Sequence, residues 1–169
     1  MSKQDFLKIT DHNELAAYFG LSYPKLAKAI YNIDDAYKYH QFVIPKKNGT
    51  ARKISSPSKR LKTIQKRLKS VLYEIYSVRP SVHGFVREKS IVTNARMHLD
   101  KKFIFNIDLE DFFGSIHFGR VRNFFTSNPF NFNKSVATIL AQICCFNNWT
   151  LAKTLTNKSV MRPHEGARK

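Results

Sequence analysis

The chain has 169 residues, of which 29 are Lys or Arg and 12 are Asp or Glu, so its formal net charge is +17 at pH 7. This length allows one domain or a piece of a larger protein, and the charge favours a polyanionic partner, with nucleic acid as the first candidate. Two adjacent cysteines, Cys144 and Cys145, are too few for a disulfide framework or a zinc site. No apolar run is long enough for a membrane span or a signal peptide, so we expect a cytoplasmic chain without a membrane partner.

Residues 1–39 are predicted to form a helical lead-in. Asp11 followed by Glu14 is typical of a helix start, and Ser22 before Pro24 indicates a second. Two such helices have the length of a helix-turn-helix, but the second, YPKLAKAIY, offers small and apolar residues where base-reading side chains are needed. We therefore expect the lead-in to pack against the region that follows it.

The stretch YHQFVIPKKNGTARKISSP, residues 39–57, predicts a β-hairpin. Phe42 and Ile44 alternate on the first strand, residues 46–49 supply the turn, and residues 51–55 return before a proline. The predicted tip is strongly positive.

A long amphipathic helix is predicted from Ser58 to Tyr76, because apolar residues recur there at helical spacing. Beside the apolar face runs a stripe of Lys59, Lys62, Lys66 and Lys69. A lysine stripe is often only a solvated helix face. Here the neighbouring hairpin is basic too, which favours contact with nucleic-acid phosphates.

The next segments are shorter. SVHGFVREKSIVTNARMHL predicts a turn or short strand at His83 and Gly84, then a helix from about Ser90. KFIFNI, residues 102–107, reads as a buried strand, and helices are expected over 117–127 and 134–146.

Three acids stand where the predicted strand ends, in the sequence NIDLEDFFGSI. Asp108 would leave the sheet at the edge of the core, where a desolvated anion is costly unless a cation compensates it. A divalent metal would supply that charge, whereas the alternative interpretation is a helix cap or a solvated loop acid.

NIDLEDFFGSI resembles the first catalytic motif of reverse transcriptases, Asp-x-x-x-x-aromatic, in the form found in bacterial retron and group II intron-like enzymes. The hairpin with its long helix is similar to the fingers of that family, and SVHGFVREKSIVTNARMHL to the segment leading into the palm. The resemblance covers residues 40–146 and implies an α+β fold with an incomplete palm. Its expected parts are a lead-in (1–39), a fingers-like region (40–100), a partial palm (101–146) and a divergent, disordered tail (147–169).

The resemblance implies a role for several residues. Asp108 matches the first catalytic, magnesium-binding carboxylate, and the Leu109 carbonyl a second oxygen on the same ion. Glu110 and Asp111 are weaker candidates for the same ion. Residues that match nucleotide-contacting positions are Lys46 or Lys47, Arg52, and Phe113 as an aromatic gate that excludes a 2′-hydroxyl. Gly114 departs from the proline common at its place, which loosens the turn without removing a catalytic group.

The implied activity is RNA-directed DNA synthesis, with an RNA template, a DNA primer or product, and dNTPs as partners. A two-metal site needs further carboxylates, but after Asp111 the only acid is Glu165, and the family's Leu-Pro-Gln-Gly and Tyr-x-Asp-Asp segments are missing. We therefore expect a truncated chain that holds at most one ion weakly and is inactive alone. The alternative is a non-enzymatic RNA-binding module. The resemblance also suggests a structured non-coding RNA as partner and antiviral defence as role.

Overall fold

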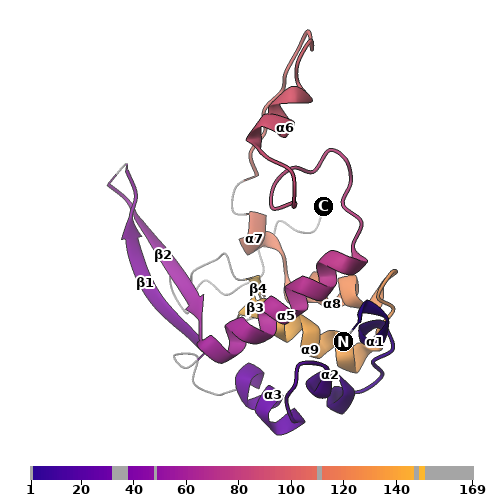
Figure 1. Ribbon diagram of the computed structural model, residues 1–169. Helices are drawn as coiled ribbons and strands as arrows, with labels where there is room; N and C mark the ends of the chain where they lie inside the picture. The colour runs from indigo at the N-terminus through magenta and orange to yellow at the C-terminus, as the bar shows by residue number, and fades with distance from the viewer. Residues whose placement is uncertain (1, 32–37, 48, 110–111, 147–148, 151–169) are drawn as a thin grey trace.

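The computed structural model describes residues 2–31, 38–47, 49–109, 112–146 and 149–150 (Figure 1). Helices form one end of the molecule, a two-stranded hairpin extends to one side, and a long excursion carries α6 away from the helices. The elements are α1 (Lys3–Leu7), α2 (His12–Tyr18), α3 (Tyr23–Tyr31), β1 (Tyr39–Pro45), β2 (Ala51–Pro57), α5 (Lys59–Ile75), α6 (Ile91–Arg96), α7 (Phe112–Ser115), α8 (Phe118–Thr126), α9 (Lys134–Cys144), β3 (Cys145–Phe146) and β4 (Trp149–Thr150).

The apolar core lies between α5, α9 and the N-terminal helices. The predicted apolar face of α5 is buried through Ile64, Leu68 and Val71, and it meets α9 and the lead-in. Buried side chains from the other elements complete the core: Phe6, Leu15, Phe19, Leu26, Phe125, Val136, Leu140 and Ile143. This confirms that the lead-in packs on the region that follows it, because α1 and α3 contact α5 while α2 and α3 contact α9.

Both lead-in helices begin where the sequence predicts. Asp11 caps α2, since its Oδ1 accepts from the amides of Asn13 at 2.6 Å and Glu14 at 2.9 Å. Glu14 bonds the Thr10 amide at 2.7 Å instead of the amide of the cap itself. The short α1, which begins with a capping box between Ser2 and Asp5, was not predicted.

The hairpin prediction is confirmed. β1 and β2 pair antiparallel, and the Lys46 amide donates to the Thr50 carbonyl at 2.7 Å across the turn. Gly49 has a φ of +78°, a left-handed conformation that favours glycine. The pairing extends to Pro57 opposite Tyr39, and α5 begins directly after it with Ser58 as its cap.

The prediction of a buried strand at 102–107 is wrong. Residues 103–109 have no secondary structure, and their apolar side chains are exposed, with Phe103 at 84% and Phe105 at 86% of full exposure. A buried strand needs partner strands for its backbone hydrogen bonds and packed layers on its faces, whereas the described strands pair only as β1 with β2 and β3 with β4. The palm expected over 101–146 is therefore represented in the described residues by helices and one small ladder.

Two further features differ from prediction. The helix predicted over 134–146 ends at Cys144, and Cys145 with Phe146 forms β3, so of the two cysteines only Cys144 is helical. The single-turn helix α7 was not predicted. The turn at His83 and Gly84 and the helix after Ser90 are confirmed, with no strand there. Of the tail expected to be disordered, only 149–150 lies within the described residues.

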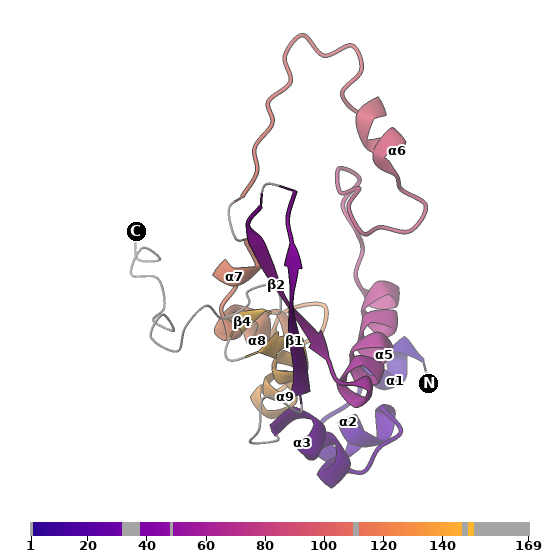
Figure 2. The same cartoon turned by 90° about the vertical axis from the view of Figure 1, so that its left-hand side faces the viewer.

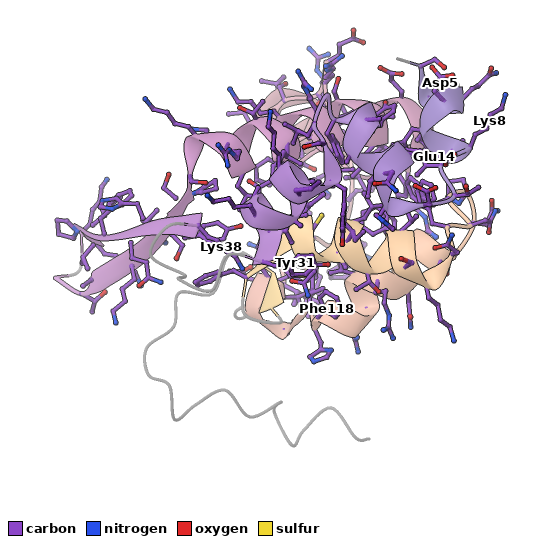
Figure 3. The ribbon with its side chains drawn as sticks, turned by 90° about the horizontal axis from the view of Figure 1, so that it is seen from below. Asp5, Lys8, Glu14, Tyr31, Lys38 and Phe118 are labelled. Atoms are coloured by element: carbon purple, nitrogen blue, oxygen red, sulfur yellow. The ribbon has the colours of Figure 1, made fainter. Side chains whose placement is uncertain are left out.

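The charges are distributed unevenly. Seen from below, the acidic Asp5 and Glu14 lie on the N-terminal helices, at the opposite end of the molecule from the hairpin (Figure 3). Between residues 38 and 107 the only acids are Glu74, Glu88 and Asp100, against many lysines and arginines. In the described part of the chain, no helix combines the length and the apolar character that crossing a bilayer demands.

Candidate nucleic-acid interface

The hairpin presents its cations at an exposed tip. The side chains of Lys46, Lys47 and Arg52 are all exposed, as the sequence predicts. Arg52 stands opposite Ile44, so the two side chains share a face of the ladder. Further along this face Phe42 is 40% exposed and stacks on His40 with 5.9 Å between ring centroids. Exposed aromatic rings beside cations are typical of surfaces that bind single-stranded nucleic acid.

The root of the hairpin is held firmly. Tyr39 is 3% exposed and packs on Phe146 with 4.6 Å between ring centroids. Gln65 Nε2 donates to the Tyr39 hydroxyl at 3.2 Å and to the Ile143 carbonyl at 2.9 Å. Burial raises the pKa of Tyr39 to about 12, although the bond from Gln65 lowers it. One amide thus joins β1, α5 and α9, and the tip projects from a fixed base (Figure 2).

The predicted lysine stripe is exposed along α5. Lys59, Lys62, Lys66 and Lys69 all face solvent beside the buried apolar face. One of them meets a loop that the sequence did not place, because Lys69 Nζ and Arg87 Cζ lie 5.5 Å and 5.6 Å from the centroid of the same Tyr73 ring. We name as the basic hollow a cavity of about 320 Å³ lined by Lys66, Lys69, Ser70, Tyr73 and Arg87.

Sequence reasoning missed Arg87 and Tyr73. Their sequence separation is fourteen positions, and only the return of the loop after α5 brings them together. The one available signal was the series Lys66, Lys69, Ser70, Tyr73, which falls on one helix face by its spacing of three and four.

Two further predicted site residues, Asp108 and Phe113, lie later in the chain. Asp108 is exposed, and it makes no hydrogen bond or ion pair with any residue that the structure describes. Phe113 is 48% exposed on α7, where its ring contacts Phe112 edge to face at 5.3 Å. In Figure 1 the tip of the hairpin and α7, the helix that carries Phe113, lie apart. Glu110 and Asp111 lie outside the described residues.

The residues that the structure describes do not by themselves form a magnesium site. The Asp108 carboxylate and the Leu109 carbonyl are oxygen donors of the kind that Mg²⁺ prefers. A two-metal centre needs several carboxylates, and within the described ranges no three His, Cys, Asp or Glu side chains come together. Asp108 therefore suits one ligand of a larger set.

The chain is similar to known proteins over most of its length. The model of the family described as reverse transcriptase (RNA-dependent DNA polymerase) matches residues 44–162. The retron Ec86 reverse transcriptase of Escherichia coli is 34% identical over 130 residues, covering 76% of this chain and 39% of that protein. Two Myxococcus xanthus proteins also match. The retron Mx162 reverse transcriptase is 38% identical over 110 residues, covering 64% of this chain and 23% of that protein. The retron Mx65 reverse transcriptase is 39% identical over 84 residues, covering 50% and 20%. The chain thus spans well under half the length of these curated relatives.

Proposed function

Because the chain belongs to the reverse transcriptase family and is of the retron type, we propose that it serves RNA-directed DNA synthesis, in which deoxynucleotides are added to a primer on an RNA template. The observation that carries this proposal is the basic surface formed by the hairpin tip and α5. Its cations are exposed on a fixed base, and the chain between residues 38 and 107 has few acids to neutralise them. Such a surface attracts phosphates, and the attraction weakens as the salt concentration rises.

The hairpin tip is proposed to bind phosphates, both those of the template strand and the triphosphate of the incoming nucleotide. Lys46, Lys47 and Arg52 supply exposed positive charge there, and phosphoryl transfer asks a protein mainly for positioning and charge neutralisation. The half-exposed Phe113 ring is proposed to lie under the sugar and to exclude a 2′-hydroxyl.

Asp108 is proposed to contribute one ligand to a divalent metal whose other carboxylates come from outside these 169 residues. In support, the sequence after Asp111 contains Glu165 as its only acid. The 169 residues by themselves are therefore proposed to bind primer–template and nucleotide without extending the primer.

A primer-extension assay tests this proposal. The purified chain is mixed with a labelled DNA primer on an RNA template, dNTPs and magnesium. Contact between the chain and dTTP is measured separately by ultraviolet crosslinking. We expect no extension, and a crosslink that falls about tenfold in Arg52→Ala but not in Lys25→Ala, which removes an equally exposed charge on α3. Extension that disappears with Asp108→Ala contradicts the proposed inactivity, and a crosslink indifferent to Arg52 contradicts the role of the hairpin.

A non-enzymatic RNA-binding module is the second candidate, and the isolation of Asp108 from other described carboxylates favours it. The magnesium dependence of the dTTP crosslink separates the two. If Asp108 helps to hold a metal, magnesium strengthens the crosslink in the wild type and not in Asp108→Ala. If the chain only binds RNA, Asp108→Ala leaves the crosslink unchanged and RNA binding equal or slightly tighter.

A further inference from the structure

We propose that the basic hollow seats one phosphodiester group of a single-stranded nucleic acid. The hollow lies between α5, which contributes Lys66, Lys69, Ser70 and Tyr73, and the loop that carries Arg87. The choice of a nucleic acid as ligand rests on the proposed function. The existence of an anion seat rests on the geometry of the hollow alone.

Tyr73 organises the hollow. Its hydroxyl donates to the Phe85 carbonyl and so fastens the loop to α5. Its ring has Lys69 Nζ at 5.5 Å and Arg87 Cζ at 5.6 Å, distances at which a cation is attracted to an aromatic ring. One side chain therefore holds two cations from different segments at the same place.

Hydrogen bonds and constrained backbone angles within residues 80–89 hold the shape of the loop. Lys89 Nζ donates to the carbonyls of Pro80 and Val82, with 2.8 Å to the latter, which closes the loop on itself. Phe85 and Glu88 have φ values of 59° and 63°, a left-handed conformation that side chains adopt only where the surroundings impose it. Arg87 lies between these two constrained residues, so its backbone position is set before any ligand binds.

The charge of the hollow is uncompensated. Within the part of the chain that the structure describes, Lys66, Lys69 and Arg87 make no ion pair with a carboxylate. Glu74 is the acid of α5. Burial is the main cause of the raised pKa of Tyr18 and the charge of Glu74 the second, so the Glu74 carboxylate lies toward α2. Three cations that repel one another gain from a shared anion, and the Ser70 hydroxyl adds a neutral donor.

A neighbouring cavity indicates a single strand. An apolar hollow of about 490 Å³ shares Lys69 and Tyr73 with the basic hollow and is also lined by Tyr76 and Phe124, whose ring centroids are 6.3 Å apart. An unpaired base next to the seated phosphate would find aromatic side chains there. In a duplex the base is stacked and paired, and this contact is closed to it.

The lead-in supplies a matched control. Lys25 on α3 is exposed, as Lys66 and Lys69 are, but it does not line the hollow. Removing it changes the net charge of the protein by the same amount and leaves the seat intact. A general electrostatic attraction therefore predicts equal effects, whereas the seat predicts unequal ones.

The test is fluorescence anisotropy with the full 169-residue chain and labelled oligonucleotides of about 20 mixed nucleotides, as single-stranded RNA, single-stranded DNA and duplex. Lys69→Gln and Arg87→Gln should each weaken single-strand binding about tenfold and lower the slope of log K against log salt by about 0.7, whereas Lys25→Gln should weaken it less than twofold. The double variant should lose less than the product of the two effects, because both cations bind one phosphate. Arg87→Lys, which keeps the charge, should retain most of the affinity.

Each outcome decides. Equal losses on RNA and DNA support a phosphodiester seat, while a loss on RNA alone overturns it. Equal losses in Lys69→Gln, Arg87→Gln and Lys25→Gln overturn the seat but leave the proposed function standing, because the wild type still binds RNA. Absence of RNA binding by the wild type at 0.05 M salt overturns both. A thermal melt of every variant shows whether it folds as the wild type does. If Arg87→Gln melts at a lower temperature than the wild type, Arg87→Lys still tests the seat.

Discussion

Replacing Gln65 by leucine should loosen the hairpin from the helices. Leucine keeps the approximate volume and the helix propensity of glutamine, so the change removes chiefly the bonds to the Tyr39 hydroxyl and the Ile143 carbonyl. Ile143 lies in the last turn of α9, where its carbonyl has no helical partner. Each lost bond costs about 1 kcal/mol and more where the partner stays buried, so we expect Gln65→Leu to lower the free energy of unfolding by about 2 to 3 kcal/mol.

Urea denaturation followed by circular dichroism measures this change. Tyr39→Phe removes one of the two bonds and should cost about 1 kcal/mol, and the double variant should lose less than the sum because the two side chains share that bond. Gln41→Ala, at an exposed glutamine of β1, serves as control and should stay within about 0.5 kcal/mol. A loss below about 0.5 kcal/mol in Gln65→Leu, or full additivity with Tyr39→Phe, would refute the reasoning.

Three further predictions concern groups whose environment is defined. Burial raises the pKa of Tyr39 to about 12, so the folded chain keeps a proton that the unfolded chain, with a tyrosine pKa near 10, releases. The free energy of unfolding should therefore fall between pH 10 and 12. Urea melts should show a less steep fall in Tyr39→Phe than in the wild type. Burial likewise raises the pKa of Cys144 to about 12 and of Cys145 to about 11, so iodoacetamide at pH 8 should modify both more than about 100-fold slower than a free cysteine; rapid modification of the native chain speaks against this. At Gly20, with a φ of +67°, an added Cβ would lie 2.9 Å from Arg67 Nη1, whereas at Gly49, with a φ of +78°, it would meet nothing within 4 Å. Gly20→Ala should therefore destabilise by more than the roughly 1 kcal/mol expected of Gly49→Ala, and equal losses in denaturation would contradict it.

Local signals in the sequence predicted the elements that depend on neighbours in the chain. The turn residues before Ala51 and the helical spacing after Ser58 determine hydrogen bonds and a buried face within one segment, and both predictions are confirmed. The retron-type family is confirmed as well. The strand at 102–107 failed because strand formation depends on partner strands, which apolar composition alone does not supply.

The contacts that position the site were beyond sequence reasoning. Gln65 reads as one more polar residue on α5, and its two partners come from β1 and from α9. Arg87 reads as one more cation in a basic loop, and its place beside Tyr73 follows from the path of that loop. Such pairings are long-range in the chain, so a pattern of residue types does not encode them. The metal and nucleotide roles of Asp108, Leu109 and Phe113 stay predictions.

The most direct test of the account compares two triple variants with the same net charge. Lys46, Lys47 and Arg52 are replaced by alanine in one, and the equally exposed Lys3, Lys8 and Lys25 of the lead-in in the other. The salt dependence of binding to a primer–template RNA is then measured for both. We expect the hairpin variant to lower the log–log slope by about 2, at about 0.7 for each lost phosphate contact, and the lead-in variant to change it little. Equal slopes in the two variants would contradict it.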